Sequence, residues 1–204
     1  MNRGIIFDFD GVICDSVNVK TEAFAALYKA YGDEVVAKVV QYHLEHGGIS
    51  RYQKFRYYHK ELLGITLSDE EVKKMGDKFS SIALQKVIDS PYLPGVLNFI
   101  EASKKDADLF ICTGTPESEI RFILDKKGLT NFFKAVYGAP KNKADIIREI
   151  MRTFHMTAEQ LEFYGDAMTD YNAAKDTNIK FTGVYSTTTS FPEGTVVIKD
   201  FIIN

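Results

Sequence analysis

The chain has 204 residues, of which 45% are hydrophobic and 26% charged, and its formal net charge is −3. This length allows one domain with an insertion, and the acidic balance argues against nucleic acid as the main partner. No apolar run approaches the ~20 residues that span a bilayer, so we expect no membrane partner. No signal-peptide pattern precedes the first strand, and two cysteines, Cys14 and Cys112, are too few for a disulfide framework. These features favour a cytoplasmic protein.

The first predicted strand ends in two aspartates. Gly4–Phe7 is apolar and bulky, as in a strand buried on both faces, and Asp8 and Asp10 follow it. Side chains alternate along a strand, so the two carboxylates point the same way if the strand lasts that far. Because close carboxylates repel each other and are costly to bury, the pair indicates a bound cation, or a nucleophile beside an acid or base. An acidic turn without a chemical role is the alternative.

Residues 15–90 are predicted to be helical throughout. Asp15 or Ser16 can cap the first helix, and apolar residues then recur at helical spacing. Four helices are expected, over residues 17–31, 34–46, 51–63 and 67–88. A rigid segment with two prolines, residues 90–95, ends the stretch.

Strands and helices alternate in the rest of the chain. Helices are predicted over residues 96–104, 116–127, 143–154 and 168–176, and strands over 109–113, 132–137, 161–164 and 179–185, with a further short strand at 195–198. This alternation is typical of a parallel sheet with helices on both faces, and the first strand must join that sheet. We therefore predict an α/β fold in which residues 1–14 and 91–204 form the core domain and residues 15–90 an inserted helical domain.

Polar residues follow the predicted strands at 109–113 and 132–137. They lie at the carboxyl ends of these strands, where ligands of parallel sheets bind. Thr113 and Gly114 offer a hydroxyl and free amides to an anion, although a simple N-cap by Thr115 is the alternative. Lys141 and Lys143 stand at a helix start, where positive charge is unfavourable. Either a nearby anion or a solvated loop accounts for them.

Acidic residues follow the fourth strand. Asp166 and Asp170 lie four residues apart and share one face of the helix that begins there, although acidic residues also suit the dipole at a helix start. Together with the earlier residues they place four aspartates, a threonine and a lysine at one edge of the sheet. Converging carboxylates need a hard cation, and Mg²⁺ is the one that oxygen ligands favour. With a lysine and free amides beside it, the pattern indicates phosphoryl transfer through an aspartyl phosphate.

These motifs resemble those of the haloacid dehalogenase superfamily. Residues 8–12 (Asp-Phe-Asp-Gly-Val) are similar to its first motif, Thr113 to its second, and residues 165–170 to its fourth, Gly-Asp-x-x-x-Asp. The third motif is a lysine, which we assign to Lys143, with Lys141 as the alternative. The inserted helices resemble the cap of the C1 subclass. The resemblance therefore implies a Rossmann-like parallel sheet core with a helical cap.

The resemblance also implies roles for the aspartates. Asp8 is expected to be the nucleophile, and Asp10 to protonate the leaving group and then activate water. The Asp8 carboxylate, the Asp10 backbone carbonyl and the Asp166 carboxylate are expected to bind Mg²⁺, with Asp170 completing or orienting this shell.

The phosphoryl group and the rest of the substrate are assigned to other residues. Thr113, Gly114 and Lys143 are expected to bind the phosphoryl oxygens. Residues 47–56 resemble the cap segment of β-phosphoglucomutases in which an arginine meets a second phosphate, so Arg51 is expected to contact an acidic group of the substrate. For Lys54 and Arg56, a solvated basic helix face is the alternative.

The chain departs from the mutase pattern at two positions. Lys20 stands where that branch has a histidine, and Gly47 where it has a lysine. We therefore predict a Mg²⁺-dependent phosphomonoesterase of the C1-capped branch, which includes phosphoglycolate phosphatases and β-phosphoglucomutases. Its expected substrate is a small phosphorylated metabolite, and a monomer or weak dimer is expected. A sugar-phosphate mutase and a non-catalytic binding protein with the same fold are the alternatives.

Overall fold

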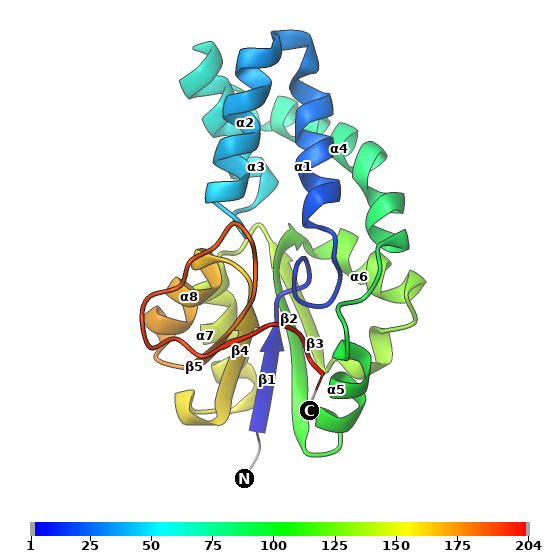
Figure 1. Ribbon diagram of the computed structural model, residues 1–204, viewed down its shortest axis with the longest axis vertical. Helices are drawn as coiled ribbons and strands as arrows, with labels where there is room; N and C mark the ends of the chain where they lie inside the picture. Colours follow the sequence, from blue (N-terminus) through cyan, green and yellow to red (C-terminus); the bar gives the residue numbers. More distant parts are fainter. Residues whose placement is uncertain (1–2, 203–204) are drawn as a thin grey trace.

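The core is a six-stranded parallel sheet in a computed structural model that describes residues 3–202 (Figure 1). The strands are β1 (Arg3–Phe7), β2 (Ala107–Pro116), β3 (Ala135–Ala139), β4 (Leu161–Gly165), β5 (Lys180–Val184) and β6 (Val197–Ile198). Their order across the sheet is β3-β2-β1-β4-β5-β6, and each neighbouring pair is parallel. The predicted α/β fold with a Rossmann-like parallel sheet is confirmed.

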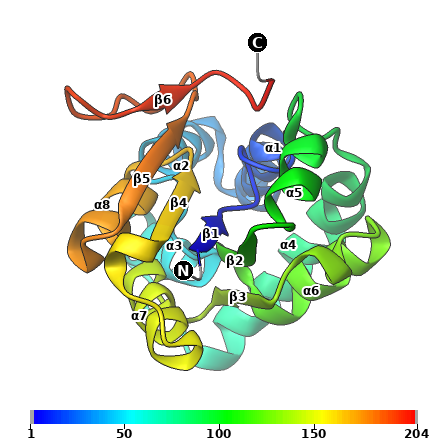
Figure 2. The ribbon, with the colours of Figure 1, turned by 90° about the horizontal axis from the view of Figure 1, so that it is seen from below.

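Helices cover both faces of this sheet (Figure 2). They are α5 (Val96–Ser103), α6 (Glu117–Lys126), α7 (Lys143–Phe154) and α8 (Met168–Thr177). Alternate residues of β1 belong to two separate hydrophobic cores. Ile5 and Phe7 pack with α5 and α6, and Ile6 packs with α7 and α8. Burial on both faces explains why β1 is a continuous apolar run.

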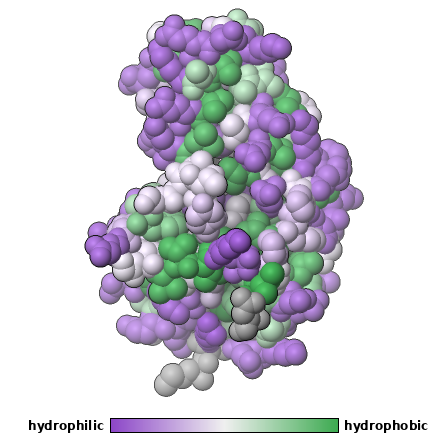
Figure 3. Space-filling model, in the orientation of Figure 1, coloured by the Kyte–Doolittle hydropathy of each residue, from purple (hydrophilic) through white to green (hydrophobic). Residues whose placement is uncertain are grey.

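A helical block follows β1 and lies beyond the carboxyl ends of the strands (Figure 1). It consists of α1 (Val17–Tyr28), α2 (Asp33–Glu45), α3 (Arg51–Tyr57) and α4 (Asp69–Asp89), with a short 3₁₀ turn at Lys29–Tyr31 and a π turn at Tyr58–Leu62. The block has its own hydrophobic core, which includes Phe24, Phe55 and Phe79. Hydrophilic residues predominate over its outer end (Figure 3). We keep the name helical block for residues 17–89.

Two chain segments join the helical block to the sheet, and they lie side by side. Cys14 and Tyr92 form an antiparallel bridge. The Asp15 amide donates to the Pro91 carbonyl at 2.9 Å. Lys127 directly follows α6, and its ammonium donates to the carbonyls of Ile88 at 2.8 Å and Ser90 at 2.9 Å. These bonds hold the two linkers together as one joint. The side chain of Lys127 attaches this joint to the core.

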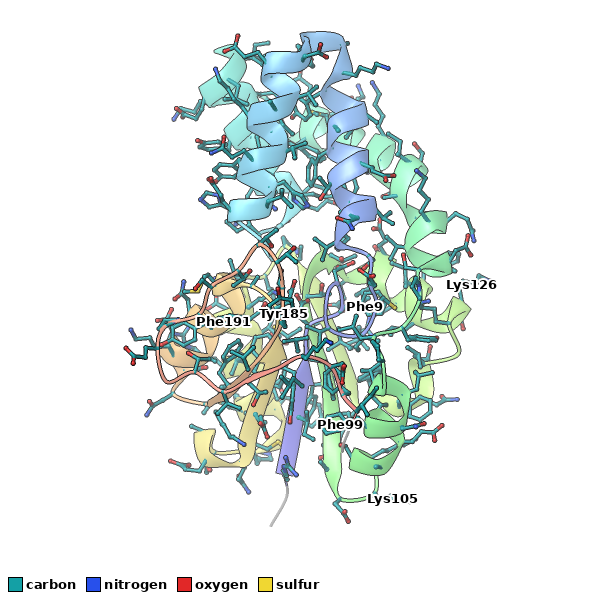
Figure 4. The ribbon with its side chains drawn as sticks, viewed as in Figure 1. Phe9, Phe99, Lys105, Lys126, Tyr185 and Phe191 are labelled. Carbon is teal, nitrogen blue, oxygen red and sulfur yellow. The ribbon has the colours of Figure 1, made fainter. Side chains whose placement is uncertain are left out.

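Replacement of Lys127 tests how far this joint stabilises the protein. We expect Lys127→Met to lower the free energy of unfolding by about 1–3 kcal/mol, because two carbonyls lose a charged donor. The adjacent Lys126 is exposed and lies over Phe122 on the outer side of the molecule (Figure 4). Lys126→Met should therefore change the free energy by less than about 0.5 kcal/mol. Urea denaturation measures both, and equal losses would contradict the role of the joint.

Several element boundaries differ from the sequence predictions. The strand β3 begins at Ala135 rather than residue 132, because Thr130–Phe132 form a 3₁₀ turn. The strand β2 continues to Pro116, so α6 begins one residue later than predicted. Ser16 stands at the start of α1 but makes no capping hydrogen bond; its hydroxyl donates to Asp10 instead. None of the helices in the described residues is long and apolar enough to cross a membrane.

Candidate active site

The central strand β1 lies where the direction of strand addition reverses. The chain moves outward from β1 through β2 to β3, then returns to the other side of β1 to form β4. Open α/β sheets bind ligands at such switch points, beyond the carboxyl ends of the strands. Asp8 directly follows β1, Thr113 lies in β2, and Asp166 directly follows β4; all three line one cavity between the sheet and the helical block.

Three buried carboxylates converge at this switch point. Asp8, Asp166 and Asp170 each offer an oxygen, and these oxygens lie within 4.8 Å of one another. Glycines make the approach possible: a Cβ on Gly165 would lie 2.2 Å from the Cβ of Asp170. A Cβ on Gly11, whose φ is +79°, would lie 2.3 Å from an Asp166 carboxylate oxygen. The glycines in the two acidic motifs are therefore required by close packing.

Lys143 is the cation that faces these carboxylates. Its Nζ donates to Asp8 Oδ2 at 2.9 Å and also to Asp170 Oδ1. Burial alone would lower the pKa of Lys143, but the carboxylates of Asp170 and Asp8 raise it well above its usual value. Lys141, by contrast, is exposed and pairs with Glu149. Of the two candidate lysines, only Lys143 contacts the acidic cluster.

The charges of the cluster fit a divalent metal ion. Burial, followed by repulsion from Asp8 and Asp170, raises the pKa of Asp166 well above its usual value. Burial likewise raises the pKa of Asp170 to about 7. With all three carboxylates ionised, the single ammonium leaves two negative charges without a partner, which is why the pKa values of Asp166 and Asp170 rise when no further cation is present. A hard divalent cation with oxygen ligands balances them, and Mg²⁺ has this chemistry.

Asp10 lies in the loop after β1 and has a separate set of partners. It accepts hydrogen bonds from Ser16 Oγ at 2.6 Å, from Thr115 Oγ1 at 3.2 Å and from the ammonium of Lys20. Burial opposes ionisation of Asp10, but the charge and hydrogen bond of Lys20 lower its pKa below the usual value. The strand ends at Phe7, so the loop rather than strand alternation brings Asp10 to the cavity.

Thr113 and Gly114 form the wall on the β2 side. Thr113 is buried, and its hydroxyl accepts a hydrogen bond from the Thr115 amide at 3.2 Å. The helix α6 begins after Pro116, so Thr115 is not its N-cap. The hydroxyl of Thr115 binds Asp10 and Lys20. Sequence reasoning missed Thr115 and Ser16 as partners of Asp10: no spacing rule relates β2 to the first loop, and Ser16 was considered only as a helix cap.

A loop of the helical block closes over this site. The Thr169 hydroxyl donates to the carbonyl of Gly47 at 2.7 Å. Gly48 has φ +75°, and a Cβ there would lie 2.1 Å from Thr169 Oγ1 and 2.9 Å from Lys143 Nζ. A Cβ on Gly114 would lie 2.5 Å from the carbonyl oxygen of Gly48. The glycines thus bring the backbone of the block into direct contact with the core, next to the phosphate-site lysine predicted from the sequence.

Arg51 lines the cavity but already has an anionic partner. Its guanidinium donates to both carboxylate oxygens of Glu119, at 2.6 and 3.0 Å, and to Ser80 Oγ at 3.0 Å. This bidentate pair links α3 of the block to α6 of the core. The role of Arg51 in substrate binding stays a prediction. In the structure its guanidinium already binds Glu119 and Ser80.

The alternative of a solvated basic helix face is wrong for Lys54. Its side chain is 2% exposed and lines the cavity, because His43 of α2 and Phe24 of α1 lie against its ammonium group. Arg56 fits the expectation: it is exposed and pairs with Asp69. The sequence shows both residues on one short basic helix, but not which side of that helix meets α2.

Known proteins share both the sequence family and the fold of this chain. Residues 5–184 match the family model of haloacid dehalogenase-like hydrolases. The search of curated proteins gave no match. The structural match to a β-phosphoglucomutase of Clostridium difficile has a TM-score of 0.79 at 18% identity and covers 98% of this chain and 92% of that one.

Two other solved structures have similar scores. A predicted phosphoglycolate phosphatase of Haemophilus somnus has a TM-score of 0.74 at 19% identity, covering 98% of this chain and 95% of that one. CbbY of Rhodobacter sphaeroides, solved in complex with xylulose 1,5-bisphosphate, has a TM-score of 0.75 at 16% identity, with coverage of 98% and 95%. At these identities the likeness concerns the fold. The family match over most of the chain, together with this shared fold, shows that the protein belongs to the haloacid dehalogenase-like hydrolases.

Proposed function

We propose that the protein is a Mg²⁺-dependent phosphomonoesterase that hydrolyses a small phosphorylated metabolite through an aspartyl phosphate on Asp8. The observation that carries this proposal is the separation of two carboxylates in one cavity. Asp8 is paired with Lys143 and lies in the acidic cluster, whereas Asp10 is paired with Lys20 and two hydroxyls. The buried free cysteines, Cys14 and Cys112, suit a cytoplasmic location.

Asp8 is positioned to be the nucleophile. Its carboxylate is held from both sides, by the Phe9 amide on Oδ1 at 2.7 Å and by Lys143 on Oδ2 at 2.9 Å. An oxygen of this carboxylate attacks phosphorus, and the bond from phosphorus to the leaving oxygen breaks. Lys143 and Thr113 then stabilise the negative charge on the phosphoryl oxygens. When bound at Asp8 and Asp166, Mg²⁺ supplies further positive charge to these oxygens, and Asp170 orients the site through Lys143.

Asp10 is positioned to move protons. In the first step its carboxyl group donates a proton to the leaving oxygen, and in the second its carboxylate takes a proton from the water that attacks the aspartyl phosphate. Lys20 stabilises the carboxylate form, which the second step needs, so the first step requires Asp10 to take up a proton against this pairing. The Gly47–Gly48 loop excludes other water from the cavity.

Metal removal and replacement test this proposal. We expect the protein to release phosphate from p-nitrophenyl phosphate, to lose this activity in EDTA and to regain it when Mg²⁺ is restored. Asp166→Asn should raise the Mg²⁺ concentration for half-maximal rate by roughly 10-fold or more. Asp176→Asn, a change on the exposed side of α8, should leave it unaltered.

Hydrolysis that persists at full rate in EDTA would contradict the metal requirement. Interconversion of sugar phosphates without release of free phosphate would contradict hydrolysis and favour the mutase. Absence of turnover over a wide panel of phosphate esters, with Mg²⁺ bound, would favour a binding protein.

A further inference from the structure

One arginine of the cavity wall connects the helical block to the core. Arg51 of α3 lines the cavity, and its two terminal nitrogens donate to the two carboxylate oxygens of Glu119 in α6, at 3.0 and 2.6 Å. The second nitrogen also donates to Ser80 Oγ of α4 at 3.0 Å. The residue expected to contact an acidic group of the substrate therefore has an acidic partner within the protein.

The carboxylate of Glu119 is held firmly in this contact. It accepts a third hydrogen bond from the hydroxyl of Ser80, at 2.5 Å. The side chains of Arg51 and Glu119 are only 7% and 12% exposed. A guanidinium that binds one carboxylate through both terminal nitrogens is the strongest form of this ion pair. Because the pair is also shielded from water, it is a specific contact between block and core rather than a loose surface bridge.

Aromatic rings fix the direction of the guanidinium. Its central carbon lies 5.0 Å from the centre of the Phe79 ring and 5.7 Å from that of the Tyr52 ring. Phe79 lines the cavity beside Arg51, whereas among residues 3–202 neither Ser80 nor Glu119 belongs to that wall. The acceptors of Arg51 thus lie outside the cavity, and its terminal nitrogens are directed to α6.

A second anionic group on the substrate would compete with Glu119 for Arg51. A guanidinium presents a single fork of this geometry to one carboxylate or phosphate at a time. If the substrate took it, Glu119 would stay buried without its counter-charge, which is strongly unfavourable. Its carboxylate would also lie close to the incoming anion and repel it. Closure of the block through Glu119 and binding of a second anion by Arg51 therefore exclude each other.

The other cations that the block adds to the cavity wall are independent of Glu119. Lys20 pairs with Asp10. The hydrogen bonds of Lys54 go to the Nδ1 atom and the carbonyl of His43. Any attraction of these two lysines for an anion is therefore the same whether or not Glu119 carries a charge. A change at Glu119 isolates the contribution of Arg51.

We propose that Glu119 is a specificity-determining residue: by holding Arg51 it lowers the affinity of the cavity for phosphate esters that carry a second anionic group. This inference rests on the proposed phosphatase function and concerns the same site. In place of the substrate contact expected from the sequence, Arg51 clamps the helical block to the core.

A binding experiment tests this selectivity without requiring turnover. Asp8→Asn protein is titrated by calorimetry, in Mg²⁺ buffer, with α,ω-alkanediol bisphosphates of increasing length and with the matching alkyl monophosphates. The bisphosphate preference is the ratio of the two affinities at the length that fits best. Adding Glu119→Gln should raise this preference by at least about 10-fold, as for a hydrogen bond to a charged group. Adding Glu119→Ala, which leaves Arg51 no acceptor at this position, should raise it at least as far.

Two controls connect the change to Arg51. Glu119→Gln combined with Arg51→Met should return the preference to within about 3-fold of the Asp8→Asn value, because the guanidinium is gone. This double change also leaves neither charge buried alone. Glu117→Gln removes another carboxylate of α6, whose partner Arg121 lies on the same helix, and should leave the preference unchanged. Circular dichroism checks folding, which should persist because other residues form the three hydrophobic cores.

An unchanged bisphosphate preference in both Glu119 variants overturns the proposal, and so does an increase that persists without Arg51. Absence of bisphosphate binding by the Glu119→Gln protein overturns it as well. Failure of the phosphatase function has a different signature: the expected rise in preference, with no phosphate release by the unmodified protein.

Discussion

Asp8→Asn is expected to lower kcat for p-nitrophenyl phosphate by on the order of 10⁴-fold or more, the largest effect of any single change in this protein. Asparagine keeps the shape of the side chain, but its amide is too weak a nucleophile to attack phosphorus. The amide oxygen of asparagine can still accept from the Phe9 amide, and Lys143 keeps its bond to Asp170, so the fold should be retained. Steady-state release of nitrophenol, with circular dichroism of the same sample, gives both results.

The control for this change lies in the same loop. Asp15 is an exposed aspartate in the first linker, and Asp15→Asn removes the same charge without touching the cavity. Its kcat should stay within about 2-fold of the unmodified value, as expected for a surface substitution. Comparable rates for Asp8→Asn and Asp15→Asn would rule out covalent catalysis by Asp8.

Gly48→Ala is expected to lower kcat/KM by roughly 100-fold, because its methyl group keeps the helical block from closing on the core. The added Cβ would lie 2.1 Å from Thr169 Oγ1 and 2.9 Å from Lys143 Nζ, so the loop must lift away from the site. Displacement of catalytic groups by about 1 Å costs on this scale. The loop can lift without unfolding, so the loss should appear in activity far more than in stability.

Gly64→Ala separates this steric effect from backbone strain. Gly64 also has a positive φ, +69°, but a Cβ there meets nothing within 4 Å. Both substitutions cost about 1–2 kcal/mol for the left-handed backbone, so both should lower the urea midpoint by a similar amount. Only Gly48→Ala should lose activity. If the two variants lose the same activity, the contact between the loop and the core has no part in catalysis.

The sequence predicted the convergence of the acidic side chains, because their positions follow from local rules. Asp8 and Asp166 directly follow strands and Thr113 lies in the second half of β2, and parallel strands bring their carboxyl ends together whatever the helices do. Lys143 follows the same logic, since it begins the helix after β3. To predict these positions, only the order of strands and helices had to be correct.

The other side of the cavity could not be predicted in this way. The burial of Lys54 depends on how α3 packs against α2, and the basic run at residues 51–56 is compatible with either an inward or an outward face. The partner of Arg51 is Glu119, which lies 68 residues away on another element. Helical spacing shows which residues share a face of a helix but not what that face contacts. The cavity residues from the helical block were therefore harder to predict than those at the strand ends.

The joint between block and core has a consequence for the timing of the reaction. Asp10 lies on the core side of the first linker, and two of its partners, Ser16 and Lys20, lie on the block side of it. If the block rotates about this joint to admit substrate, the rotation withdraws a hydroxyl and an ammonium from this carboxylate. In the mechanism proposed above, Asp10 would then hold the partners that stabilise its carboxylate form only in the closed state, when the aspartyl phosphate is shielded from other water.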